Sequence, residues 1–274
     1  MKQNIKQLER TANTLRQDVI RMLEQAGSGH TAGPLGMADI FAALYFNILN
    51  HNPKKPLWEK RDRLILSCGH IVPIRYAAMA RAGYFPLSWL KTLRKLGSKL
   101  QGHPSYIDMP ALESSSGPLG QGVSVAVGKA LAAKMNKQRH FIYCVTSDGE
   151  HDEGETWEAI MTAAKYKLDN LIFIVDRNMI QIDGFTEKIM PLTHLHEKYL
   201  AFKWQVEQIN GNKMEEILKA VNKLKKIKGK PKVIIAHTIP GKGVSFMENK
   251  WEWHGKAPSI EEAKKALIEL QKAL

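Results

Sequence analysis

Three apolar runs of strand length constrain the fold of this chain more than any other feature. They are HFIYCVT (140–146), LIFIVD (171–176) and KVIIAHT (232–238), with the shorter WQVEQI (204–209) before the last. Helical patterns alternate with them, over 123–135, 156–167 and 213–227. Strands that are apolar on both faces and alternate with helices are typical of a parallel sheet covered on both sides. The sequence therefore predicts an α/β fold, a parallel sheet covered by helices on both faces.

The N-terminal half continues this alternation. Helical patterns over 4–26 and 37–49 precede a short strand pattern at 63–67, and a further helix is predicted over 73–82. Residues 97–120 are rich in Gly, Ser and Pro and predict a long loop, a kind of segment that often carries function. A last helix is predicted over 257–274. Because no repeat and no linker interrupts the pattern, we expect a single domain over residues 1–274.

The chain is basic, with 40 Lys and Arg against 27 Asp and Glu and a formal net charge of +13. Much of the excess lies in residues 198–274, where the helix predicted over 213–227 has a lysine-rich outer face. We interpret this face as solvated, because no zinc-ligand set or RNA-binding aromatic signature accompanies it. We therefore expect no nucleic-acid partner, and a basic cleft would instead concentrate small anions.

The sequence gives no sign of a membrane or of an oxidising compartment. No apolar run reaches the roughly 18 residues of a membrane span, and the segment MKQNIKQLER has no signal-peptide core. Two cysteines, Cys68 and Cys144, are too few for a disulfide scaffold. We therefore expect a cytoplasmic protein without a membrane partner.

Polar residues follow two of the apolar runs at the point where each strand is predicted to end. Asp148 follows the run 140–146, and Asn178 follows the run 171–176. Ligands of parallel sheets bind at the carboxyl ends of the strands, and carboxylate and amide oxygens suit Mg²⁺. Gly149 would let the backbone approach a phosphate closely. This edge of the sheet is therefore predicted to hold a cation and a diphosphate.

The segment from Asp148 to Asn178 resembles the metal-binding motif of thiamin diphosphate enzymes, and further segments resemble the N-terminal part of transketolases. In the family's order these are SGHTAGPLGMADI (28–40), LSCGHIVPIRYA (66–77), QGHPS (101–105), SSGPLGQG (115–122), SDGEHDEGETWEA (147–159), DRNMIQIDG (176–184) and PGKGVSFMENKWEWHG (240–255). The resemblance implies the thiamin diphosphate-binding fold of a diphosphate-binding domain. It also identifies the chain as similar to the N-terminal subunit of a split transketolase.

The resemblance implies a metal site and a diphosphate site. Mg²⁺, or another divalent cation such as Ca²⁺ or Mn²⁺, would be bound by Asp148, by Asn178 and by the backbone carbonyl of Ile180. Gly149 and Glu150 would lie against the diphosphate of the cofactor. These positions agree with the strand ends at which the residues themselves predict a cation.

The resemblance also assigns residues to the rings of the cofactor and to the substrate. Ile182 would lie near the thiazolium ring, and the segment Gly117, Pro118, Leu119 would touch the aminopyrimidine. Glu153 matches an acidic residue that joins a carboxylate network between the two active sites of transketolases.

Four histidines complete the implied site. His30 and His103 would contact sugar hydroxyls, His70 would lie by the cofactor and the donor, and His254 by the diphosphate and the reacting carbonyl. Imidazole suits this work because it exchanges a proton near neutral pH.

The implied activity is that of a transketolase in carbohydrate metabolism, with the pentose phosphate pathway as the expected setting. With the cofactor as electron sink, the C2–C3 bond of a ketose phosphate breaks and a two-carbon ketol unit moves to an aldose phosphate. No residue here matches the glutamate that activates the cofactor, which transketolases carry in a pyrimidine-binding domain. We therefore expect a C-terminal partner subunit that supplies this glutamate, a heterotetramer, and no activity of this chain alone.

Two alternatives remain at this stage. A 2-oxo acid dehydrogenase alpha chain or a chain similar to 1-deoxyxylulose 5-phosphate synthase would share the metal motif, but not the SGHTAG, QGHPS and WHG segments together. A non-catalytic basic binding protein would have no affinity for thiamin diphosphate, and its binding to nucleic acid would depend steeply on salt.

Overall fold

The computed structural model describes residues 2–272 and contains a five-stranded parallel sheet at its centre. The strands in spatial order are β1 (Arg63–Leu66), β2 (Ile142–Ser147), β3 (Leu171–Arg177), β7 (Lys232–His237) and β6 (Gln205–Asn210). Every neighbouring pair runs parallel. The predicted fold class is therefore confirmed.

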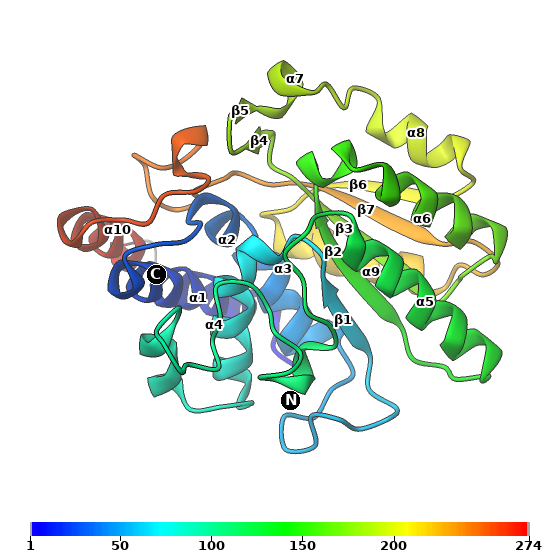
Figure 1. Cartoon of the computed structure of the whole chain (residues 1–274), viewed down its shortest axis with the longest axis horizontal. Helices are drawn as coiled ribbons and strands as arrows, with labels where there is room; N and C mark the ends of the chain where they lie inside the picture. The colour runs from blue at the N-terminus through cyan, green and yellow to red at the C-terminus, as the bar shows by residue number, and fades with distance from the viewer. Residues whose placement is uncertain (1, 273–274) are drawn as a thin grey trace.

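Helices cover both faces of the sheet, as Figure 1 shows. One face is packed by α1 (Ile5–Ala26), α3 (Ala38–Ala43), α4 (Val72–Ala82) and α9 (Met214–Lys225), and α10 (Ile260–Lys272) lies on α1. The other face is packed by α5 (Gln121–Met135), α6 (Gly154–Lys165) and α8 (Leu195–Ala201). Successive side chains of β2 alternate between the two cores, Tyr143 toward the first and Cys144 toward the second.

Local sequence signals set the ends of α1. Asn4 and Gln7 form a capping box at its N-terminus, and Gly27 ends it in the left-handed conformation with φ 65°. Leu8, Leu15 and other apolar residues at helical spacing are fully buried against the sheet-side core. The predicted helix over 4–26 is confirmed to within one residue.

Two predicted helices differ in extent from the structure. The helix predicted over 37–49 consists of α3 and a π-helical turn (Leu44–Ile48), and a short helix that was not predicted, α2 (Ala32–Gly36), precedes it. At Gly36 the chain passes so close to Ile239 that a Cβ would lie 2.9 Å from its carbonyl oxygen. The helix predicted over 257–274 begins only at Ile260, after Pro258, and residues 273–274 lie outside the described part of the chain.

A small unit beyond the carboxyl end of β3 was not predicted. It consists of the hairpin strands β4 (Ile180–Gln181) and β5 (Gly184–Phe185), followed by the short helix α7 (Thr186–Ile189) (Figure 1). Strands of two residues are too short to produce a periodic pattern. This hairpin stands above the edge of the sheet where the sequence predicts ligand binding.

The remaining regular segments are 3₁₀ turns, at Gly69–Ile71, Leu87–Thr92, Pro110–Leu112, Gly149–Asp152 and Trp251–Trp253. The predicted loop over 97–120 contains only one of them and is otherwise irregular. Among the helices of residues 2–272, none has the length and apolar character needed to cross a membrane.

Candidate active site

The two strand-end residues predicted to bind a cation lie on neighbouring strands. β2 and β3 pair in parallel, with Ser147 opposite Asp176, so Asp148 and Asn178 follow at the same edge of the sheet. The side chain of Asp148 is completely buried and Asn178 is nearly so. Both therefore lie beneath the surface at the carboxyl ends of the central strands, where such sheets bind ligands.

A hydrogen-bonded turn holds the predicted metal residues together. The backbone N–H of Met179 donates to Oδ2 of Asp148 at 2.8 Å, and the N–H of Ile180 donates to Oδ1 of Asn178 at 3.0 Å. Met179 has φ 66°, and this left-handed conformation reverses the chain so that both bonds form. The N–H of Gly149 donates to Oδ1 of Asp148 at 2.8 Å. Asp148, Asn178 and Ile180 thus belong to one local unit, as expected from the sequence.

Arg177 is a member of this unit that sequence reasoning missed. Its guanidinium lies 3.2 Å from Oδ2 of Asp148 and also pairs with Glu187 on α7. Burial raises the pKa of Asp148 to about 6, and the charge of Arg177 acts in the opposite direction. The only sequence signal was a basic residue between two polar strand-end residues.

Asp176 was also missed, and it orients the amide of Asn178. Its carboxylate accepts a hydrogen bond from Nδ2 of Asn178 at 2.8 Å and another from the hydroxyl of Thr238 at the end of β7. Complete burial raises the pKa of Asp176 to about 7. Because the amide nitrogen is held by Asp176, the amide oxygen is fixed on the side of Ile180.

The side chain of Glu150 does not face this edge. Its carboxylate is fully buried and accepts hydrogen bonds from the backbone N–H of Gly120 at 2.8 Å, from that of Ser147 at 3.2 Å, and from the hydroxyls of Ser67 and Thr146. These donors belong to the ends of β1 and β2 and to the start of α5. The carboxylate therefore fastens three elements together, and only the backbone of Glu150 remains to contact a diphosphate.

Gly149, the residue before Glu150, lies at a crowded point of the turn. A Cβ at Gly149 would lie 3.1 Å from Oε1 of Gln181 on β4. That oxygen is buried and has no hydrogen-bond partner among residues 2–272. The Gln181 side chain of the hairpin therefore lies close against the backbone of the turn at Gly149.

Three of the four predicted histidines form a cluster. The ring centroids of His30 and His70 are 4.9 Å apart, those of His30 and His254 are 5.4 Å apart, and those of His70 and His254 are 5.2 Å apart. The three rings come from three loops that are distant in the sequence. His103 is near enough that its charge would lower the pKa of both His30 and His70.

Burial keeps the clustered imidazoles neutral. It lowers the pKa of His30 and of His254 to about 4, and that of His70 well below its ordinary value, with the neighbouring histidines acting in the same direction on His30 and His70. Nδ1 of His254 is buried without a hydrogen-bond partner among the described residues. Neutral imidazole rings offer one nitrogen that donates a hydrogen bond and one that accepts a hydrogen bond.

Arg94 borders this cluster and was not predicted. A Cβ at Gly102 would lie 2.7 Å from Cζ of Arg94, so the guanidinium lies directly over that glycine. Its charge contributes to the lowered pKa of His30 and, after burial, of His103. Arg94 is itself exposed and has no carboxylate within 4.0 Å among residues 2–272. The sequence carries no signal for this placement.

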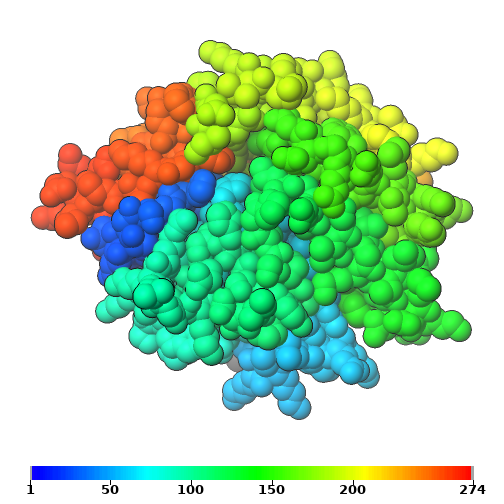
Figure 2. Space-filling view, viewed as in Figure 1, coloured from blue at the N-terminus to red at the C-terminus, as the bar shows by residue number. Residues whose placement is uncertain are grey.

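The β4–β5 hairpin joins the Asp148 unit to the histidine cluster. Ile182 lies at its tip with 57% of its surface exposed, and its Cδ1 is 2.6 Å from where a Cβ of Gly255 would lie. Gly255 directly follows His254. In Figure 2 the yellow-green hairpin region, the orange segment near residue 250 and the blue segment near residue 30 border one another on one face.

The predicted ring-contact segment lies beside His103. A Cβ at Gly117 would be 3.9 Å from the ring of His103, Pro118 is exposed, and Leu119 is partly buried against the core. Glu153 is exposed at the start of α6. Its predicted place in a network between active sites stays a prediction.

Comparison with known proteins then assigns the family. A family model described as "Transketolase, thiamine diphosphate binding domain" matches residues 7–271. The chain belongs to the transketolase family. It is 43% identical over 265 residues to the 6-deoxy-6-sulfo-D-fructose transketolase subunit SqwG of Clostridium sp. (strain MSTE9), with 97% of this chain and 96% of that protein covered. It is 38% identical over 270 residues to an apulose-4-phosphate transketolase subunit of Phocaeicola vulgatus, covering 98% of this chain and 96% of that protein.

Solved transketolase structures agree with this assignment. The transketolase of Campylobacter jejuni superposes with a TM-score of 0.92 and 39% sequence identity, covering 98% of this chain and 43% of that one. The chain thus spans about two fifths of a full-length transketolase and nearly all of the relatives that are named as subunits. By these matches it is the N-terminal, thiamine diphosphate-binding subunit of a split transketolase, and the two alternative classes are not favoured.

Proposed function

We propose that this transketolase subunit works with a C-terminal partner chain to move a two-carbon ketol unit from an anionic ketose to an aldose phosphate. The observation that carries the proposal is the joint position of the Asp148 unit and the histidine cluster on one edge of the sheet. The β4–β5 hairpin connects the two through Ile182 and Gly255. A diphosphate-bearing cofactor and the reacting carbons of a sugar can therefore be served by one continuous site.

The residues present fit a divalent cation with thiamine diphosphate. Oδ1 of Asp148 and Oδ1 of Asn178 each accept one backbone N–H, and both are hard oxygen donors of the kind that Mg²⁺ prefers. Oε1 of Gln181 and Nδ1 of His254 are buried without partners among residues 2–272, as expected for groups that meet a ligand. We propose Asp148, Asn178 and the carbonyl of Ile180 as the metal ligands.

When bound, the cofactor supplies the electron sink that lets the C2–C3 bond of the ketose break. The residues of this chain bind and orient the substrate around it. We assign the hydroxyls of the sugar to His30 and His103, and the reacting carbonyl to His254, whose neutral ring can donate a hydrogen bond to the carbonyl oxygen. Arg94 lies beside His30 and His103 and is suited to the anionic group at the far end of the sugar.

The partner chain is proposed to supply a pyrimidine-binding domain with the activating glutamate. We expect two copies of each chain in a heterotetramer, with the cofactor between the two chain types. The exposed hairpin tip at Ile182 and the exposed start of α6 at Glu153 would both face this contact. Cys68 and Cys144 are buried and unpaired, which fits our proposal of a cytoplasmic setting.

The sugar that is transferred is proposed only as a class. The two subunit relatives are named for a sulfonated ketose and for a ketose phosphate, both of which are anionic. A net charge of +13 favours the approach of such substrates. We therefore propose an anionic ketose donor, with Arg94 as its distal contact.

The experiment is a reconstitution of the chain with a separately expressed C-terminal transketolase chain that contains a pyrimidine-binding domain. Ketol transfer is assayed for each chain alone and for the mixture, with thiamine diphosphate and with or without Mg²⁺. We expect activity only in the mixture and only with the metal. Substantial transfer by this chain alone would contradict the split-subunit proposal.

Asp148→Asn provides the site-directed test, because it removes one charged metal ligand while keeping the shape of the side chain. We expect thiamine diphosphate affinity to lose its dependence on Mg²⁺. Asp108→Asn is the matched control, since Asp108 is an exposed carboxylate of the 97–120 loop to which we assign no cofactor contact. Equal effects of the two substitutions would show that Asp148 is not a metal ligand.

A further inference from the structure

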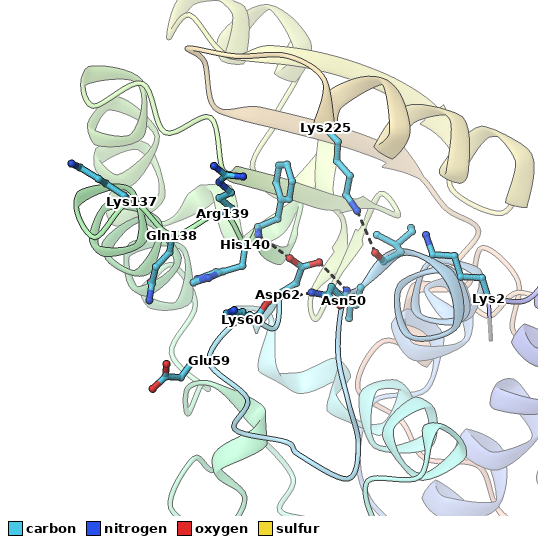
Figure 3. A pocket seen from close by; sticks show the side chains of 13 residues that line it. Lys2, Asn50, Glu59, Lys60, Asp62, Lys137, Gln138, Arg139, His140 and Lys225 are labelled. Atoms are coloured by element: carbon cyan, nitrogen blue, oxygen red, sulfur yellow. Dashed lines mark hydrogen bonds between the residues drawn. The ribbon is translucent and has the colours of Figure 1, made fainter.

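The largest cavity described on the molecule lies at the opposite edge of the sheet from the active site. It has a volume of about 820 Å³ and is bordered by the loops that lead into β1 and β2 and by the end of α9 (Figure 3). Asp62 and Phe141 directly precede these two strands, whereas Asp148 follows the carboxyl end of β2. The cavity is therefore separate from the site proposed for ketol transfer.

The walls of this cavity are rich in positive charge. Five cationic side chains line it, and they come from Lys2, Lys60, Lys137, Arg139 and Lys225. Figure 3 shows that they come from several different segments and that the side chain of Lys137 points away from the other four. Because a concave, low-dielectric wall focuses the field of such charges, the cavity attracts anions more strongly than an equally charged flat surface.

None of these five cations is neutralised by a carboxylate in the described part of the chain. No Asp or Glu oxygen of residues 2–272 lies within 4.0 Å of their nitrogens. Nζ of Lys225 donates to the carbonyl of Ile48 at 3.2 Å and lies 5.5 Å from the ring centre of Phe141. Its charge is thus held at the wall of the cavity, where Asp62 is near enough to act on it but forms no ion pair with it.

The two carboxylates of the cavity do not offset this excess. Asp62 accepts the backbone N–H of Asn50 at 2.9 Å and that of Phe141 at 2.8 Å, so it joins the two loops at the base of the cavity. Glu59 is exposed at the margin, away from the other labelled side chains (Figure 3). The cavity is therefore bordered by more cations than anions.

We propose that this cavity binds a small polyanion, a molecule that carries two or more phosphoryl groups. Its volume falls within the range of about 300–1,000 Å³ that is usual for small-molecule sites. Lysines and an arginine that border one hollow offer donors for the several oxygens of linked phosphoryl groups. Free pyrophosphate and a nucleoside diphosphate share this chemistry.

The test is calorimetric titration of the full chain with inorganic pyrophosphate and, separately, with ADP, in low salt and without divalent metal. Hydrogen–deuterium exchange locates the site. We expect both probes to bind and to protect residues 57–63 and 136–141. Tighter binding of ADP would identify a nucleotide as the ligand, whereas equal binding would identify the diphosphate alone, and either supports the cavity as the site.

Lys60→Ala combined with Arg139→Ala removes two exposed cations and should weaken binding at least about tenfold. Lys264→Ala combined with Lys265→Ala is the matched control, because it removes the same charge from the exposed face of α10 and should leave binding unchanged. Equal loss in both variants, no binding of either probe, or protection confined to residues 147–154 would overturn the proposal. Neither the titrations nor the hydrogen–deuterium exchange measures ketol transfer, so their results test this proposal independently of the proposed function.

Discussion

Replacing Glu150 by glutamine tests whether this residue acts on the fold or on the cofactor. The substitution keeps the shape of the side chain but exchanges one acceptor oxygen for an amide group. The hydroxyls of Ser67 and Thr146 can rotate to accept a hydrogen bond from that amide, but the backbone N–H groups of Gly120 and Ser147 can only donate. One of these buried N–H groups would therefore lose its acceptor.

The expected cost follows from this loss. A hydrogen bond to a charged acceptor contributes about 1.5–3 kcal/mol, and a buried donor left without a partner costs about 1–3 kcal/mol. We therefore expect the free energy of unfolding to fall by about 2–4 kcal/mol, a large part of the total for a domain. Urea unfolding followed by tryptophan fluorescence measures this change, and titration of the reconstituted complex measures thiamine diphosphate affinity.

Glu153→Gln serves as the matched control, because Glu153 carries the same charge a few residues away and is exposed. The free energy of unfolding of this control variant should differ from that of the unsubstituted chain by less than about 0.5 kcal/mol. If Glu150→Gln unfolds at the same urea concentration as the unsubstituted chain but loses cofactor affinity, the carboxylate faces the ligand and the reasoning is refuted.

Three further predictions concern the histidine cluster and its surroundings. Arg94→Ala removes a cation beside His30, so the pKa of His30 should rise; an unchanged NMR titration of this ring would contradict the contact. His30 and His254 titrate at about 4 in the folded chain against an ordinary value of 6.5, so the unfolded chain binds more protons between these values. The free energy of unfolding should therefore fall as the pH drops from 7 to 5, by about 2 kcal/mol for each histidine, and urea unfolding at both pH values should show a smaller difference in His254→Gln. Gly255→Ala places a methyl group 2.6 Å from Ile182 and should weaken cofactor binding, and Ile182→Ala should restore it if the clash is the cause.

The sheet was predictable because both of its faces are buried. Continuous apolar runs mark β2, β3 and β7, and no tertiary information is needed to recognise them. The short helix α2 was not predicted, because its glycine-rich sequence is typical of a loop; its last residue, Gly36, approaches Ile239, about two hundred residues away in the sequence. The β4–β5 hairpin is too short to leave a pattern at all.

The active site was predictable where topology alone decides it. Asp148 and Asn178 follow adjacent parallel strands, so their proximity follows from the fold class. Topology does not decide the direction of a side chain. Glu150 lies in the same motif as Asp148, yet its carboxylate points into the protein interior. The positions of Arg94 and Asp176 likewise depend on contacts between distant segments, which a single sequence does not display.

The order of the strands has a consequence for how this chain folds during synthesis. β7 lies between β3 and β6, although it follows both in the sequence. Until residues 232–237 have left the ribosome, the facing edges of β3 and β6 have no neighbour, and each presents open backbone groups. We expect the nascent chain to be most prone to aggregation and to chaperone capture in this interval, because its last central strand must insert between two elements that are already present.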